Sequence, residues 1–179
     1  MALAQSGFEL FGENGGGDSG RIKSIQAGGG SLSSTFQNVN IDPVDPDKSV
    51  VLVTFRSETS SLPATLTSAS ISPDGTSISL RRDDSVGGRV IYYWQVIEFE
   101  GVKSLQKGAT LMTTQSLDVT IDPIDISKSL LFFSNYFHST SYTTPDALLM
   151  GQIVNQTTLG FQQYTTRNRT VVWQVIEFE

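Results

Sequence analysis

The sequence predicts an all-β protein made of two tandem homologous antiparallel β-sandwich or β-barrel modules, preceded by an extended N-terminal arm. The heptapeptide WQVIEFE occurs at residues 94–100 and again at residues 173–179. Short runs of apolar and β-branched residues alternate with turn signals, which is typical of strands. No window has the apolar period of a helix, and Ser, Thr and Gly are too frequent for long helices.

Two further pairs of segments recur upstream of the heptapeptides. IKSIQ at residues 22–26 matches VKSLQ at residues 102–106, and VNIDPVDPDKSVVLV at residues 39–53 matches VTIDPIDISKSLLFF at residues 119–133. All three landmarks keep their order at an offset of about 80 residues, so a complete module is duplicated.

The repeat divides the chain into three parts. We expect an N-terminal arm at residues 1–20, a first module at residues 21–100 and a second module at residues 101–179. No linker separates the modules, because Glu100 runs directly into the start of the second copy. Such tight joining favours two modules that pack side by side.

Strands can be placed within each module. Residues 50–55 form a short apolar run after a turn-rich Asp-Pro segment, which predicts a buried strand, and residues 130–133 are its counterpart. Residues 70–72 and 77–80 alternate on either side of Pro73-Asp74-Gly75, which predicts a hairpin.

The last strand of each module, at residues 89–99 and 170–178, has apolar residues on both faces. A strand with one solvated face should carry polar residues on that face. We therefore expect one face to meet the core of its own module and the other to meet the sister module or another subunit. The residues predicted for such inter-module or subunit contacts are Tyr92, Trp94, Phe99, Trp173 and Phe178.

Composition argues against several classes of protein. The net charge of −6 does not favour nucleic-acid binding, which needs clustered Lys and Arg. No apolar run approaches the length of a membrane span. The N-terminus lacks the basic start and apolar centre of a signal peptide, so we expect synthesis in the cytoplasm without export. The absence of cysteine excludes disulfides and thiolate chemistry.

No catalytic, cofactor-binding or metal-binding residue is predicted. His138 is the one histidine, and we interpret it as a loop or interface residue rather than a catalytic one. The cluster Asp42, Asp45 and Asp47 leaves two alternatives open. Clustered carboxylates are typical of calcium sites, but the spacing of an EF-hand is absent. The other interpretation is a rigid turn that proline and aspartate side chains stabilise.

Glycine runs and the N-terminal segment complete the pattern. The runs at residues 15–17 and 28–30 lack the ending of a phosphate-binding loop, so we interpret them as flexible joints.

Phe8, Leu10 and Phe11 form an apolar cluster ahead of a glycine-rich tether. We expect these three side chains to anchor the arm in a groove on a neighbouring chain.

The IKSIQ segment, the apolar VVLV run and the closing W-Q-V-I-E-F resemble a family of small β-modules in structural proteins of tailed bacteriophages. The resemblance covers residues 21–179 and carries no catalytic residue with it. It implies a non-enzymatic protein of the virion surface that forms homotrimers. We expect a head decoration or cement protein that binds the major capsid protein or other virion subunits. The alternative is a tail-tip or tail-fibre adhesin that binds a host receptor or glycan, and a glycan-cleaving tail enzyme is a weaker third class.

Overall fold

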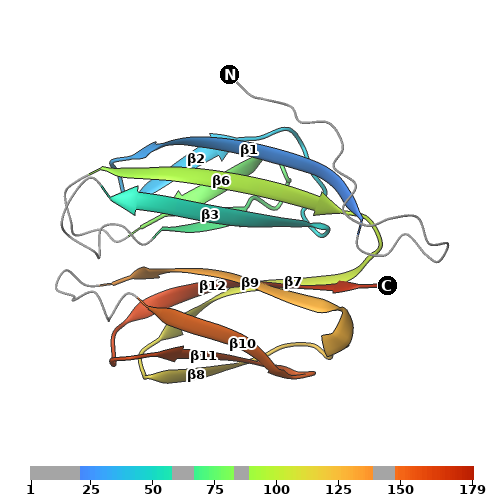
Figure 1. Ribbon diagram of the computed structural model, residues 1–179. Helices are drawn as coiled ribbons and strands as arrows, with labels where there is room; N and C mark the ends of the chain where they lie inside the picture. Colours follow the sequence, from blue (N-terminus) through green and yellow to red (C-terminus); the bar gives the residue numbers. More distant parts are fainter. Residues whose placement is uncertain (1–20, 58–66, 83–88, 139–147) are drawn as a thin grey trace.

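The computed structural model describes residues 21–57, 67–82, 89–138 and 148–179, and in these residues the chain is all-β (Figure 1). A single turn of 3₁₀ helix, η1 (Ile126–Lys128), accompanies the strands within the described residues. The predicted fold class is confirmed, because the strands form two successive modules, each made of two three-stranded antiparallel sheets.

In the first module, the last strand, β6, lies between β1 and β3 in one of the two sheets. Its two sheets have the orders β1-β6-β3 and β2-β5-β4. Strand β6 contains the first copy of the repeated heptapeptide and is hydrogen-bonded on both sides, which makes it the central strand of its sheet. The strands are β1 (Ile22–Leu32), β2 (Phe36–Asn40), β3 (Ser49–Ser57), β4 (Ser68–Ile71), β5 (Ser77–Arg81) and β6 (Val90–Phe99).

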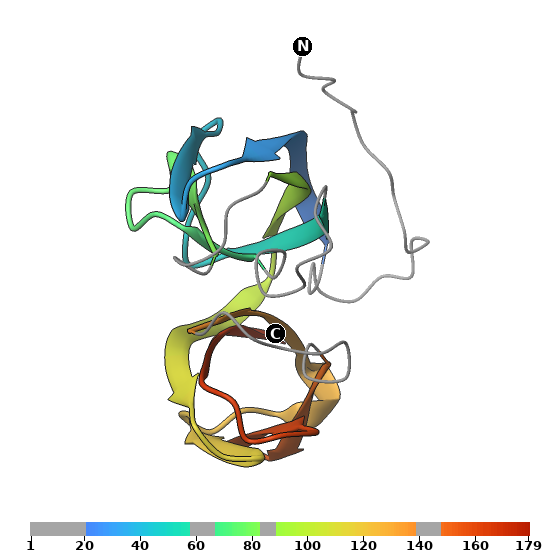
Figure 2. The same ribbon diagram turned by 90° about the vertical axis from the view of Figure 1, so that its left-hand side faces the viewer.

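The second module repeats this arrangement. Its sheets have the orders β7-β12-β9 and β10-β11-β8, so β12 takes the central place that β6 has in the first module. The strands are β7 (Val102–Met112), β8 (Ser116–Thr120), β9 (Ser129–Phe137), β10 (Leu149–Asn155), β11 (Thr158–Gln163) and β12 (Arg169–Phe178). Figure 2 shows both modules end-on, with the two sheets of each module enclosing its interior.

Each module has its own apolar core with a tryptophan in it. The first core gathers Leu32, Ile78, Leu80 and Trp94, and the second gathers equivalent side chains around Trp173. Each tryptophan lies against a glycine on the neighbouring strand, because Gly28 pairs with Trp94 and Gly108 pairs with Trp173. A Cβ atom at Gly28 or Gly108 would lie 2.6 or 2.5 Å from the indole ring, so a larger residue does not fit.

The prediction that residues 28–30 form a flexible joint is wrong. All three glycines lie inside β1, where they pair with consecutive residues of β6. Gly28 makes room for the Trp94 ring, and Gly30 makes room for the Tyr92 ring, whose hydroxyl oxygen would be 2.7 Å from an added Cβ atom. The run of small residues is therefore matched to the run of aromatic residues on the adjacent strand, a long-range relation that local sequence does not reveal.

The two modules pack against each other through a third apolar cluster. Val50 and Phe99 from the first module meet Ile176 from the second, and all three are buried. The rings of Phe99 and Phe178 touch edge-to-face with their centroids 5.3 Å apart. In Figure 1, the β7-β12-β9 sheet of the second module faces the first module.

Candidate functional site

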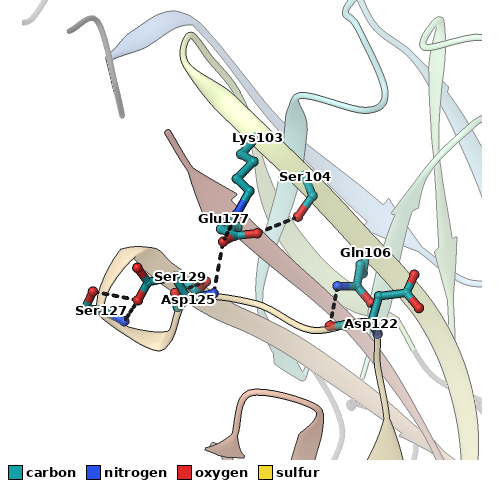
Figure 3. Close-up of polar contacts among 8 residues, drawn as sticks. All are labelled: Lys103, Ser104, Gln106, Asp122, Asp125, Ser127, Ser129 and Glu177. Atoms are coloured by element: carbon teal, nitrogen blue, oxygen red, sulfur yellow. Dashed lines mark hydrogen bonds and ion pairs between the residues drawn. The ribbon is translucent and has the colours of Figure 1, made fainter.

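The repeated motif residues meet in a polar network around a buried glutamate (Figure 3). In the second module, Glu177 accepts hydrogen bonds from Lys103 Nζ at 2.8 Å, from Ser104 Oγ at 3.2 Å and from the backbone N–H of Asp125 at 2.9 Å. The Glu177 side chain is 2% exposed, whereas that of Lys103 is 61% exposed. The network therefore joins β7, β12 and the Asp-Pro turn around one buried carboxylate, while Lys103 and Asp125 are exposed to solvent.

A β-bulge aims the lysine at the carboxylate. Glu177 pairs with Ser104 and Phe178 pairs with Val102, so Lys103 is an extra residue on β7. Bulges of this kind bend a strand locally and redirect a side chain. The same irregularity occurs at Lys23, because Glu98 pairs with Ser24 and Phe99 pairs with Ile22.

Ionisation of the pair follows from these contacts. The hydrogen bond and the attraction from Glu177 raise the pKa of Lys103 above its ordinary value of 10.5. The hydrogen bond from Lys103 is the main cause that lowers the pKa of Glu177 below 4.5, and it outweighs the opposing effect of burial. Both groups are therefore charged across the neutral range, which favours a structural ion pair over a proton donor or acceptor.

The first module builds the same network from the equivalent residues. Glu98 accepts hydrogen bonds from Lys23 Nζ at 2.8 Å, from Ser24 Oγ at 3.2 Å and from the backbone N–H of Asp45 at 3.3 Å. The hydrogen bond to Glu98 raises the pKa of Lys23, as in the second module. The lysine and serine of IKSIQ and the first glutamate of WQVIEFE are thus parts of one arrangement.

The glutamine of the motif holds the start of the Asp-Pro turn. Gln26 donates to the backbone carbonyl of Asp42 and accepts from its backbone N–H, both at 2.8 Å. Gln106 makes the same two bonds to Asp122, at 3.0 and 2.7 Å. A primary amide matches a backbone N–H and C=O pair in this way, so the glutamine acts as a short substitute for a neighbouring strand.

The contacts of the aspartates are those of the rigid turn. The side chain of Asp45 accepts a hydrogen bond from the backbone N–H of Asp47, and that of Asp125 accepts from the backbone and hydroxyl of Ser127. The hydrogen bond from the Ser127 hydroxyl is the main cause that lowers the pKa of Asp125. Among residues 21–57, 67–82, 89–138 and 148–179, no group of three or more His, Cys, Asp or Glu side chains is placed to hold a metal ion.

The aromatic residues predicted for inter-module or subunit contacts divide into two groups. Phe99 and Phe178 meet each other where the modules join. Tyr92 and Trp94 instead lie in the core of the first module, at 2% and 8% exposure, which corrects their assignment. Trp173 lies in the core of the second module at 8% exposure and also lines the cleft between the modules. Successive side chains along a strand point to opposite faces of the sheet, and the two tryptophans point to the inner face.

Gln174, which was not among the predicted contact residues, makes two hydrogen bonds between the modules. The side chain of Gln174 accepts from the backbone N–H of Val51 and donates to its carbonyl, both at 3.1 Å, and is 7% exposed. Strand β3 lies at the edge of its sheet, where backbone groups lack a neighbouring strand. Gln174 on β12 therefore covers one position of the β3 edge, and only its place in the heptapeptide could have suggested a role.

The modules also enclose a cleft of about 440 Å³. Arg81 lies over the ring of Tyr136 at 5.1 Å, so a cation–π contact crosses from one module to the other. The hydroxyl of Ser49 is buried in the lining and has no hydrogen-bond partner. The residues that line the cleft include Phe36, Ser49, Ser68, Arg81, Lys107, Tyr136 and Trp173.

The remaining residues singled out in the sequence are His138 and the apolar cluster of the N-terminal arm. His138 follows the last residue of β9 and is exposed; its Nε2 is 2.7 Å from the hydroxyl of Thr170, and its ring touches Tyr136 edge-to-face. Phe8, Leu10 and Phe11 lie outside the described residues.

In the described part of the chain, no helix has the length and apolar character needed to cross a bilayer. No protein-family model, curated protein or solved structure matches the chain.

Proposed function

We propose that the protein is a non-enzymatic structural component of a tailed-bacteriophage virion, a homotrimer that decorates the outer surface of the head. The observation that carries this proposal is the double use of the motif. The Lys, Ser and Glu of the motifs on which the resemblance depends form the same network around a buried glutamate in both modules. These side chains hold strands and turns together, and the resulting rigidity suits a protein that binds and stabilises a larger assembly.

The partner in this proposal is the major capsid protein, and the arm at residues 1–20 provides an anchor. Phe8, Leu10 and Phe11 supply clustered apolar surface, which is needed to offset the entropy that ordering a flexible segment costs, about 1–2 kcal/mol per residue. The modules supply a rigid body to which the arm is attached.

Counting the chains in purified virions tests this function. Quantitative mass spectrometry of the phage that encodes the chain should find it in hundreds of copies per particle, in fixed ratio to the capsid protein. A few copies per particle would move it to the tail, and absence from washed particles would overturn a virion role altogether.

The inter-module cleft favours a tail adhesin as the second candidate. Pockets for small ligands combine apolar and aromatic walls with a few polar groups, and the cleft offers Phe36, Tyr136, Arg81 and the buried Ser49 hydroxyl. Binding of the purified protein to a glycan array would support this candidate if Arg81→Ala and Phe36→Ala abolish the signal. An aromatic residue in a polar loop would also suit an adhesin, and the sequence offers Tyr142 in the segment HSTSYTTPD at residues 138–146. Tyr142 lies outside the described residues.

A further inference from the structure

The contact between the two modules joins equivalent residues at Phe99 and Phe178 and unlike surfaces elsewhere. The first module contributes the side of its sandwich where β3 and β4 lie, and the second module contributes the outer face of its β7-β12-β9 sheet. The bond from Gln174 to the Val51 backbone runs from that face to that edge. Because the modules are homologous, each also has the surface that the other uses in this contact.

The equivalent edge on the second module is open and apolar. Val50 in β3 is completely buried, whereas Leu130 at the same position of β9 is 50% exposed. Ser68 in β4 is 3% exposed, whereas Met150 at the same position of β10 is 54% exposed. We call Leu130, Met150 and the neighbouring Ile126, itself 45% exposed, the second-module edge.

The equivalent face on the first module is open along part of its length, whereas Ile97 and Phe99 at one end pack in the contact between the modules. Gln95 on β6 has the position of Gln174 on β12 and is exposed, and Tyr93 beside it is 66% exposed. Ile25 on β1, which pairs with Ile97 two residues beyond Gln95, is 41% exposed. We call Ile25, Tyr93 and Gln95 the first-module face.

We infer that the second-module edge of one chain docks on the first-module face of a second copy, repeating between chains the contact that joins the modules within a chain. The amide of Gln95 then binds the backbone of Leu131 in the second copy, as Gln174 binds Val51. Leu130 and Met150 are buried in this contact, as Val50 and Ser68 are buried within the chain. Burial of the apolar surface of Leu130 and Met150 favours association.

One difference between the two contacts fits the same conclusion. Within the chain, Lys107 donates to the carbonyl of Pro46 at 2.9 Å and lies 3.6 Å from Asp47. The equivalents are Ala27 on the first-module face and Ile126 and Ser127 at the second-module edge. A polar pair inside the chain is thus replaced by an apolar pair between chains, so the exposed Ile126 gains a partner.

Such a contact is heterologous, because two different surfaces meet head-to-tail. Heterologous contacts produce closed rings or open filaments. Three chains closed in this way form a ring of six modules, which would supply the trimer of the proposed function. The inference rests on the self-association in that proposal but not on attachment to a virion. The two can therefore fail separately, because one is measured with the purified protein and the other with particles.

Complementation between two variants tests the contact. Leu130→Asp spoils the second-module edge, and Tyr93→Asp spoils the first-module face. Both side chains are exposed in the single chain, so both variants should keep the wild-type melting temperature. In sedimentation equilibrium, the wild type should exceed the 19.5 kDa of one chain, and each variant alone should sediment as a monomer. An equimolar mixture should give a complex of two chains, because one variant keeps its edge and the other its face.

Tyr164→Asp provides the matched control, since Tyr164 is 74% exposed and belongs to neither surface. It should leave the wild-type assembly unchanged. A wild type that stays monomeric at every concentration would overturn the inference. An assembly that survives both Leu130→Asp and Tyr93→Asp would also overturn it and would assign self-association to another surface, such as the arm.

Discussion

Replacing Glu177 with alanine should strongly destabilise the second module. The change removes the acceptor of three hydrogen bonds, from Lys103, Ser104 and the Asp125 backbone, inside a site where the carboxylate is 2% exposed. Hydrogen bonds to charged groups contribute about 1.5–3 kcal/mol each, and the contact with the exposed Lys103 is screened by solvent. The total loss should therefore be roughly 3 kcal/mol in the free energy of unfolding.

Thermal and urea unfolding followed by Trp fluorescence measure this loss. If the two modules unfold together, the melting temperature should fall by roughly 6–12 °C, at about 2–4 °C per kcal/mol for a chain of this size. Glu98→Ala removes the same contacts in the first module and should have a similar effect, whereas Lys103→Ala should have a smaller one. Wild-type melting of Glu177→Ala would refute the structural role of the network.

Acid should remove the same contribution. The folded-state pKa of Glu177 lies below its ordinary value of 4.5, so the stabilisation is complete above that pH and is lost as the pH falls through the folded-state pKa. The stability difference between wild type and Glu177→Gln should therefore shrink below about pH 4.5. For Lys103, whose pKa is raised, the sign is opposite, and its contribution is lost as the pH rises above 10.5. A difference that stays constant from pH 7 to pH 3 would contradict this assignment.

Three further changes have expected outcomes. Gly108→Ala should cost about 1–3 kcal/mol in unfolding experiments, because the added methyl group overlaps the Trp173 ring; no loss would mean that the ring can move aside. Ile176→Ala should cost about 2–5 kcal/mol and weaken the packing of the modules, whereas Ile97→Ala, at the equivalent half-buried position, should cost less. Deletion of residues 2–19 should leave melting unchanged and abolish binding to particles that lack the protein; undiminished binding would assign attachment to the modules.

The fold was predictable from sequence because the same pattern of strands and turns occurs twice in the chain, so each copy supports the assignment of the other. The offset between the IKSIQ and VKSLQ segments located both modules, apolar runs located β3 and β6, and strand alternation located β5. Residues 28–30 show where this reasoning fails. Their glycines suggest a flexible joint locally, whereas their place in β1 depends on aromatic side chains more than 60 residues away in the sequence, at Trp94 and Tyr92.

The candidate sites were less predictable, because identical sequence takes different roles in the two modules. Gln95 and Gln174 stand in the same heptapeptide, yet one is exposed and the other binds the Val51 backbone. No local pattern distinguishes them, since the difference arises from which side of each module the other one covers. The recurrence of polar Lys, Ser and Glu at matching positions of both copies is the sequence signal that indicates these networks.

The most direct test of the repeated contact uses two chains that each carry one introduced cysteine. The natural chain has none, so Gln95→Cys and Leu130→Cys each supply one thiol, on the first-module face and at the second-module edge. A short bismaleimide added to an equimolar mixture should produce a covalent pair that contains one chain of each kind, identified by mass spectrometry. Each variant alone should give little product, because like positions do not meet in a heterologous contact. A mixture that cross-links no better than its separate components would contradict the account.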